Sequence, residues 1–156
     1  MGTGRIWITD KRIKDAQMEL IRAGFPTKIS ILAPRKFVMV ISLKKLKKTI
    51  EETIGTRYKY LIRDASKGQK TAMEIILIGD FSNLQVEQYK NLLTRFKQAG
   101  FDVDLTISED MKRLTLHIDL APIKEVFTAR GISSKYFTVS LKVKNNEPFL
   151  TFLFGR

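Results

Sequence analysis

The chain has 156 residues, and its 28 Lys and Arg outnumber its 16 Asp and Glu, so the formal net charge is +12 and the isoelectric point is near 10.0. Hydrophobic residues make up 44% of the sequence, which supports a buried core and excludes a disordered polyelectrolyte. Because cysteine is absent and histidine occurs once, disulfides, thiolate metal sites and two-histidine catalytic pairs are excluded.

The sequence also bears on location. No apolar run approaches the roughly 18 residues that a membrane span needs. The first residues, Met1-Gly2-Thr3-Gly4-Arg5, lack the apolar centre of a signal peptide. We therefore expect an intracellular, cytoplasmic protein that does not insert into a membrane.

Four helices are predicted from their caps and their apolar spacing, after a first strand at residues 5–9. The first helix follows Asp10 and ends at Gly24, and the second spans residues 43–54 after Ser42. The third helix is predicted from the spacing of Ser82 and Gln85, which is that of a capping box, and it ends at residue 100. The fourth is opened by residues 119 and 122 and stopped by residue 131.

Pairs of β-rich runs follow each helix, with turn signals between the partners. The pairs are 28–32 with 37–41, 58–62 with 72–78, 103–107 with 114–120, and 136–143 with 149–154. The predicted order is thus helix, strand, strand, repeated four times.

An internal similarity accompanies this order. Ala23-Gly24-Phe25 recurs in the second half of the chain as Ala99-Gly100-Phe101. We predict an α+β fold made by tandem duplication of a ferredoxin-like β-α-β-β-α-β unit, with antiparallel sheets that carry helices on one face. The first, strongly basic repeat would span residues 1–65. The second would span residues 66–156 with an extra C-terminal strand, and the two would pack as one compact unit.

The most unusual segment lies at the start of the second helix. Lys44, Lys45, Lys47 and Lys48 crowd its first turns, where the helix dipole disfavours cations. A local arrangement that opposes stability suggests another purpose, and contact with phosphates is the first candidate. The alternative is a solvated helix face.

Further cations belong to the same half, which has a net charge of +9 against +3 for residues 66–156. Arg57, Lys59 and Arg63 alternate with Tyr58 and Tyr60 along one predicted strand, an arrangement that suits backbone contacts with base stacking. The alternative places both tyrosines in the core. The remaining predicted nucleic-acid contacts, at the other hairpin of this half, are Lys28, Arg35 and Lys36.

An acidic cluster is predicted in the second half. Strand alternation places Asp102, Asp104, His117 and Asp119 on one outward surface, with the histidine opposite one of the first two carboxylates. Such ligands suit Mg²⁺ or Mn²⁺, with Asp102, Asp104 and His117 as candidate metal ligands. The alternative is a set of ordinary solvent-facing residues and a helix cap.

Three functions follow, in order of preference. The first is a non-enzymatic protein that binds DNA or RNA through backbone phosphates with low sequence specificity. The second is a metal-dependent nuclease that uses the acidic cluster, the one case in which Mg or Mn would be a cofactor. The third is an assembly protein that forms a homodimer or docks on another protein through Phe149, Phe152 and Phe154. No small-molecule cofactor is expected.

Overall fold

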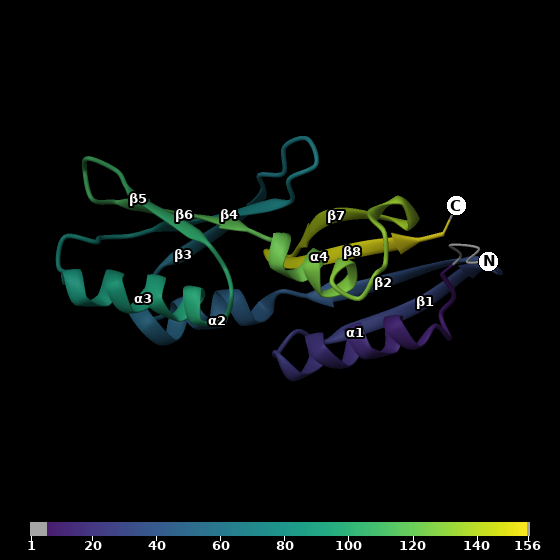
Figure 1. The fold of residues 1–156 in the computed structure, drawn as a ribbon. Helices are drawn as coiled ribbons and strands as arrows, with labels where there is room; N and C mark the ends of the chain where they lie inside the picture. Colours follow the sequence, from purple (N-terminus) through teal and green to yellow (C-terminus); the bar gives the residue numbers. More distant parts are fainter. Residues whose placement is uncertain (1–5, 156) are drawn as a thin grey trace.

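The computed structural model describes residues 6–155, which form four α-helices, a short 3₁₀-helix and eight β-strands (Figure 1). In chain order the elements are α1 (Lys11–Arg22), β1 (Thr27–Ala33), β2 (Lys36–Ser42), α2 (Lys44–Ile54), β3 (Lys59–Asp64), β4 (Ala72–Ile78), α3 (Val86–Gln98), β5 (Val103–Ile107), β6 (Arg113–Asp119), α4 (Ala121–Thr128), η1 (Ser134–Tyr136), β7 (Phe137–Lys144) and β8 (Glu147–Phe154). The predicted order of helix, strand, strand, repeated four times, is confirmed. Within these residues, no helix is long and apolar enough to cross a membrane.

The strands form two four-stranded antiparallel sheets. One sheet has the order β1-β2-β8-β7 and is flanked by α1 and α4, and we call this unit lobe A. The other has the order β3-β4-β6-β5 and is flanked by α2 and α3, and we call it lobe B. Lobe A thus combines the first and last helix–strand–strand units, and lobe B the middle two. The boundary expected at residues 65 and 66 lies in the β3–β4 hairpin of lobe B.

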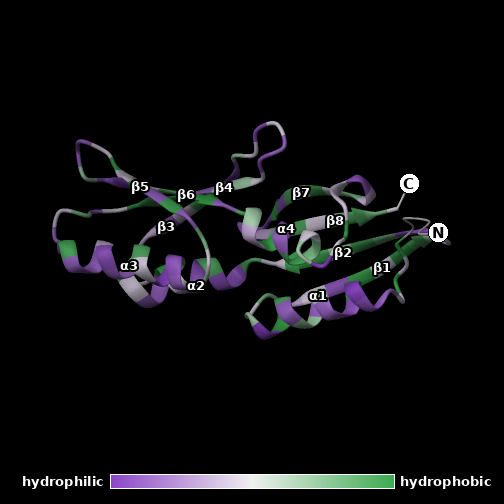
Figure 2. Cartoon of the chain, in the orientation of Figure 1, coloured by the Kyte–Doolittle hydropathy of each residue, from purple (hydrophilic) through white to green (hydrophobic). Residues whose placement is uncertain are grey.

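Each sheet buries one face because its side chains alternate along the strands. In lobe A, Met39 of β2 lies opposite Phe152 of β8, and both are fully buried. Phe127 of α4 packs on this face, with its ring centroid 4.7 Å from that of Phe152 and 5.4 Å from that of Phe154. Phe152 and Phe154 therefore belong to the chain's own core and are not free for docking. Figure 2 shows the same division, with apolar strands beside helices that turn polar residues outward.

A pair of matching backbone hydrogen bonds lies where the chain crosses between the lobes, one extending the β2–β8 ladder of lobe A and the other the β4–β6 ladder of lobe B. The Leu43 N–H donates to the carbonyl of Pro148 (3.0 Å), and the Leu120 N–H donates to the carbonyl of Thr71 (2.9 Å). The two donors are separated by the same interval in the sequence as the two acceptors. In one bond the first half of the chain supplies the donor and the second half the acceptor, and in the other bond the reverse holds. The pattern extends further: Ser42 N–H donates to the carbonyl of Pro26, and Asp119 N–H to that of Asp102.

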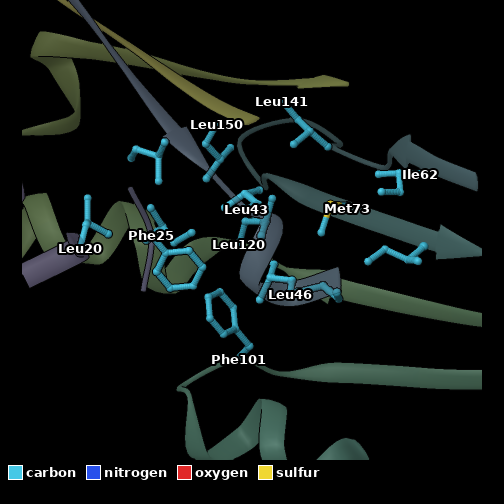
Figure 3. Packing of buried hydrophobic residues seen from close by; sticks show 14 of the residues in the cluster. Leu20, Phe25, Leu43, Leu46, Ile62, Met73, Phe101, Leu120, Leu141 and Leu150 are labelled. Carbon is cyan, nitrogen blue, oxygen red and sulfur yellow. The ribbon is translucent and has the colours of Figure 1, made fainter. Parts of the chain in front are cut away.

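Side chains at this junction follow the same pattern. Phe25 and Phe101, the last residues of the two similar tripeptides, pack edge to face with their ring centroids 5.8 Å apart. Figure 3 shows these rings beside Leu43 and Leu120 in the core. We call residues that occupy matching places corresponding residues. The offset in numbering is 76 from α1 and β1 to α3 and β5, and 77 from β2 and α2 to β6 and α4.

A second link joins the lobes at the β7–β8 turn. Asn146 lies there in the left-handed region, with a φ of 60°. Its amide nitrogen donates to the carbonyl of Tyr60 (2.7 Å), and its side-chain oxygen accepts from the Ile62 N–H (3.2 Å). One side chain of lobe A therefore supplies hydrogen bonds to the edge strand β3 of lobe B.

Two local predictions are wrong. Residues 6–9 do not form a strand: the Asp10 N–H donates to the carbonyl of Trp7 (2.9 Å), which turns the chain into α1. The apolar alternation there reflects packing of Ile6 and Ile8 against the core, and Arg5 lies outside the described residues. Helix α3 begins after Gln85, not after Ser82.

The start of α3 shows why the spacing of Ser82 and Gln85 predicted the wrong N-cap. Gln85 is the N-cap, and its backbone N–H donates to the side-chain oxygen of Gln88 (3.0 Å) as part of a capping box. Ser82 instead lies in a preceding turn, where its N–H donates to Asp80 Oδ1 (3.0 Å). Two successive capping motifs are compatible with the same sequence, and the second one forms.

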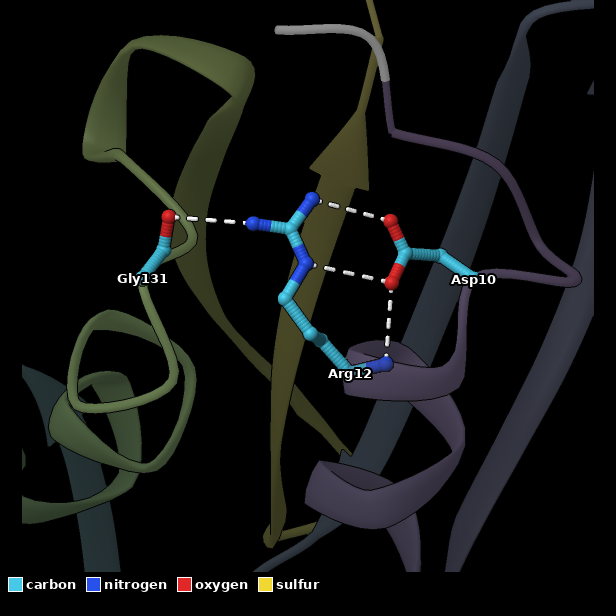
Figure 4. Close-up of polar contacts among 3 residues, drawn as sticks. All are labelled: Asp10, Arg12 and Gly131. Atoms are coloured by element: carbon cyan, nitrogen blue, oxygen red, sulfur yellow. Dashed lines mark hydrogen bonds and ion pairs between the residues drawn. The ribbon is translucent and has the colours of Figure 1, made fainter. Parts of the chain in front are cut away.

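The predicted cap at Asp10 is confirmed and does more than cap α1 (Figure 4). Its Oδ1 accepts from the Arg12 N–H (2.8 Å), and its carboxylate pairs with the Arg12 guanidinium (2.9 Å). That guanidinium also donates to the carbonyl of Gly131 beyond α4 (3.2 Å). The hydrogen bond from the Arg12 side chain is the main reason that the pKa of Asp10 lies below its ordinary value of 3.8.

Replacing Asp10 tests this contact. Asp10→Ala should lower the free energy of unfolding by about 1 kcal/mol at neutral pH, because an N-cap is lost. Asp10→Asn keeps a capping oxygen but has no charge. Because the folded pKa of Asp10 is lowered, the wild-type advantage over Asp10→Asn is complete above pH 3.8 and is lost as pH falls below it. Urea unfolding at several pH values measures this, and a constant difference down to low pH would contradict it.

Candidate functional site

A cavity of about 540 Å³ opens at the junction of the two lobes, on the side of the helices. It lies between the end of α1, the end of β2 and the outer faces of α2 and α3. We call it the basic cleft, and its lining residues are Gly24, Pro26, Ser42, Lys44, Lys45, Lys48, Thr49, Glu52 and Arg95. Its volume is within the range of small-molecule sites, roughly 300–1,000 Å³.

The spacing of residues along α2 places its cations in the cleft. Leu46 and Ile50 are buried against the sheet of lobe B. Lys44, Lys48 and Glu52 follow one another at helical i, i+4 spacing, so they form one row along an exposed side of the helix. Glu52 pairs with Arg95 of α3, and Arg95 Nη2 lies 3.2 Å from Glu52 Oε1. Packing of α3 against α2 thus adds an arginine to the row.

Lys45 is held differently. Its ammonium donates to the carbonyl of Ala23 at the end of α1 and lies 5.6 Å from the centroid of the Phe25 ring. The chain passes beneath it at Gly24, which has a φ of +95°. A Cβ at Gly24 would lie 2.7 Å from Lys45 Cδ and displace the lysine side chain, and the positive φ itself favours glycine here. Lys45 therefore ties lobe A to α2 and still adds its charge to the cleft.

The charge of the cleft is strongly unbalanced. Four cations line it, and its single carboxylate, Glu52, is bound by Arg95. In addition, Lys44 and Lys45 occupy the first turn of α2, where the positive end of the helix dipole opposes them. An anion in the cleft would be attracted by both sets of charges.

The corresponding positions in the other half of the junction carry no cations. The four cationic residues are, in order, Lys44, Lys45, Lys48 and Arg95. The corresponding residues of α4 and α1 are Ala121, Pro122, Glu125 and Glu19. Helices α1 and α4 pack together there, and Arg130, just beyond the end of α4, forms an ion pair of the opposite polarity with Glu19 of α1 (2.7 Å). The same frame therefore forms with neutral or acidic residues at every one of these places.

The other predicted cations lie elsewhere. Lys47 lies 5.1 Å from the ring centroid of Tyr60, and Arg57 lies 5.9 Å from that of Tyr58. Both tyrosines pack into or against the core, as one of the two interpretations held. Burial raises the pKa of Tyr60 to about 12, with smaller contributions from Glu51 and Tyr58. These rings are therefore engaged in packing, which disfavours their use as platforms for base stacking.

Most of the remaining predicted cations lie on the sheet faces that carry no helix. Lys59 and Arg63 point away from α2 on β3, and Lys28 points away from α1 on β1. Arg35 lies in the β1–β2 turn, 5.7 Å from the centroid of the Trp7 ring, and Lys36 begins β2. The predicted contacts therefore occupy more than one face of the protein.

The acidic cluster is partly as predicted. Asp104 lies opposite His117 across β5 and β6, one of the two expected registers. Asp102, Asp104, His117 and Asp119 all line a pocket of about 240 Å³, which we call the acidic pocket. Lys70 lines it too, and within residues 6–155 no group of three or more His, Asp or Glu side chains is arranged to hold a metal ion.

Two residues at these sites escaped sequence reasoning. Glu74 of β4 binds Arg63 and lies 3.3 Å from His117 Nδ1, so it draws the histidine and the arginine into one row with Asp104. Arg95 lies far from the lysine run in sequence. Only the packing of α2 on α3 and the pairing of β4 with β6 bring these residues to their partners.

Comparison with known proteins gave no match to a family model, to a curated protein or to a solved structure. The site is therefore assigned from its geometry and charge.

The lysine at the start of α2 gives a test that separates function from stability. Lys44→Ala should raise the free energy of unfolding by about 0.3 to 1 kcal/mol, because it removes a cation from the helix N-terminus. Lys44→Glu should raise it further. Lys90→Ala, on the exposed face of α3, is the matched control and should have little effect. Urea unfolding checks all three, and a loss of stability in both Lys44 variants would show that this lysine supports the fold.

Proposed function

We propose that the protein binds nucleic acid, mainly through backbone phosphates and with low sequence specificity. The observation that carries this is the convergence of four cations on the basic cleft, at positions where the corresponding residues are neutral or acidic. A cation such as Lys44, at a helix N-terminus where the dipole opposes it, is expected where a polyanion binds.

The type of cation supports low specificity. Lys44, Lys45 and Lys48 present flexible point charges, which neutralise phosphates but read few base edges. The net charge of +12 adds long-range attraction, which speeds encounter with any strand and weakens as salt rises.

Duplication of an ancestral unit accounts for the matching halves of the chain. Matching hydrogen bonds at a nearly constant offset along the chain support two repeats, α1 to β4 and α3 to β8. A boundary between β4 and α3 fits these bonds better than one at residue 65. In this view one copy of the helix junction acquired cations and became the binding site.

Binding is tested by fluorescence anisotropy with labelled duplex DNA, single-stranded DNA and RNA across a range of salt. The cleft variant carries Lys44→Ala, Lys48→Ala and Arg95→Gln. Its log–log salt dependence on duplex DNA should be shallower than wild type by about 2 to 3, because each lost phosphate contact removes about 0.9.

The matched control removes the same number of charges from exposed positions outside the cleft, with Lys11→Ala, Lys14→Ala and Lys90→Ala. It should keep most of the wild-type affinity. Equal losses in the two variants would contradict the cleft as the binding site. No binding of any probe at low salt would contradict nucleic-acid binding itself.

The nuclease alternative is tested on the same samples. It predicts cleavage that requires Mg²⁺ or Mn²⁺ and disappears in Asp104→Ala, a residue of the acidic pocket. The binding protein proposed above predicts intact oligonucleotides on a gel, with or without metal. Metal-dependent cleavage that survives Asp104→Ala would contradict the acidic pocket as an active site.

A further inference from the structure

The cations of the basic cleft are gathered at one point. Lys44, Lys48 and Arg95 approach a single cavity from two helices, and Lys45 closes it from the side of α1. None of the other predicted cations lines this cavity: Lys47, Arg57 and Arg35 lie beside aromatic rings, and Lys59 and Arg63 lie on the exposed face of β3. Internal phosphates of a strand, in contrast, are spread along it at regular spacing, and an extended stripe of cations matches them best.

The charge of the cleft fits a different phosphate. Four cations and one carboxylate leave an excess of three positive charges around one cavity. An internal phosphodiester brings one negative charge, whereas a terminal phosphate monoester carries about −1.5 to −2 at neutral pH and has three free acceptor oxygens. A terminal phosphate therefore compensates more of the cleft's charge at a single point.

The size and construction of the cleft agree with this ligand. Its volume of about 540 Å³ exceeds what a phosphate group needs and leaves room for the attached sugar and base. Lys45 is fixed by the Ala23 carbonyl and the Phe25 ring, and Arg95 by Glu52, so two of the four cations lose little freedom when an anion binds.

Resting on the proposed function, we propose that the basic cleft recognises the phosphorylated end of a nucleic-acid strand. The terminal phosphate monoester enters the cleft and accepts hydrogen bonds from Lys44, Lys48 and Arg95. The rest of the strand lies outside the cleft and makes weaker contacts with the protein. The protein is thus an end-binding protein, and its preference is for the phosphate and not for the base sequence.

The test uses the full chain and one oligonucleotide sequence in three forms: unphosphorylated, 5′-phosphorylated and 3′-phosphorylated. A fourth, unphosphorylated oligonucleotide is one nucleotide longer, so it carries an equal number of phosphates without a phosphorylated end. Wild type should bind one of the phosphorylated forms about tenfold more tightly than the longer control. The preference should vanish in Lys48→Ala and in Arg95→Gln, with circular dichroism showing that both variants are folded.

The outcomes separate the two proposals. Salt-sensitive binding of all forms with equal affinity would overturn end recognition and leave nucleic-acid binding intact. Binding of none of them at low salt would overturn both. A nucleoside monophosphate or inorganic phosphate is added as competitor in a further arm. If it displaces the oligonucleotide at concentrations near the oligonucleotide's own Kd, the ligand is the free phosphate compound, and recognition of a strand end is overturned.

Discussion

The structure depends on an exchange of the chain between the two lobes, which occurs where α2 and α4 begin. Leu43 and Leu120, the residues before α2 and α4, donate hydrogen bonds to the start of β8 and to the residue before β4, respectively. The chain leaves lobe A after β2, builds all of lobe B, and returns to pair β8 with β2. The sheet of lobe A is therefore incomplete until the last strand arrives. Such long-range pairing slows folding relative to local topologies.

The basic cleft is a direct product of that exchange. Helix α2 starts where the chain crosses between lobes, so its first residues face the end of α1 as well as α3. Lys45 fastens this position through the Ala23 carbonyl, and Gly24 leaves the space that the lysine needs. A cleft between two lobes would change shape if the lobes moved. Two contacts oppose such movement: that of Lys45 with the end of α1, and that of Asn146 with β3. All four cations lie on α2 and α3 of lobe B, so the packing of these two helices sets where their side chains begin.

Local features were predictable from the sequence, whereas the assignment of strands to sheets was not. The cap at Asp10, the buried faces of the helices and the eight strands that form follow from local patterns, and so does the position of His117 opposite one of two carboxylates, of which the structure selects Asp104. Nothing local distinguishes a β2 that pairs only within its own half from one that also pairs across it with β8. For the same reason Arg95 and Glu74 escaped notice, because each acquires its role only from a neighbouring element. The predicted strand at residues 6–9 failed because packing against a core and pairing in a sheet produce the same alternation.

Comparison of corresponding residues divides the sequence into what the fold needs and what it does not. The left-handed glycines after α1 and α3 and the paired rings of Phe25 and Phe101 occur in both places, so they belong to the frame. The charges differ: Pro26 and Ser42 line the basic cleft, and their corresponding residues Asp102 and Asp119 line the acidic pocket. Matching positions thus line a cation-rich cavity in one half and a pocket with three carboxylates in the other. If a polyanion binds in the cleft as proposed, the carboxylates of the acidic pocket would repel it, so the charges that attract it are confined to one of the two matching sites.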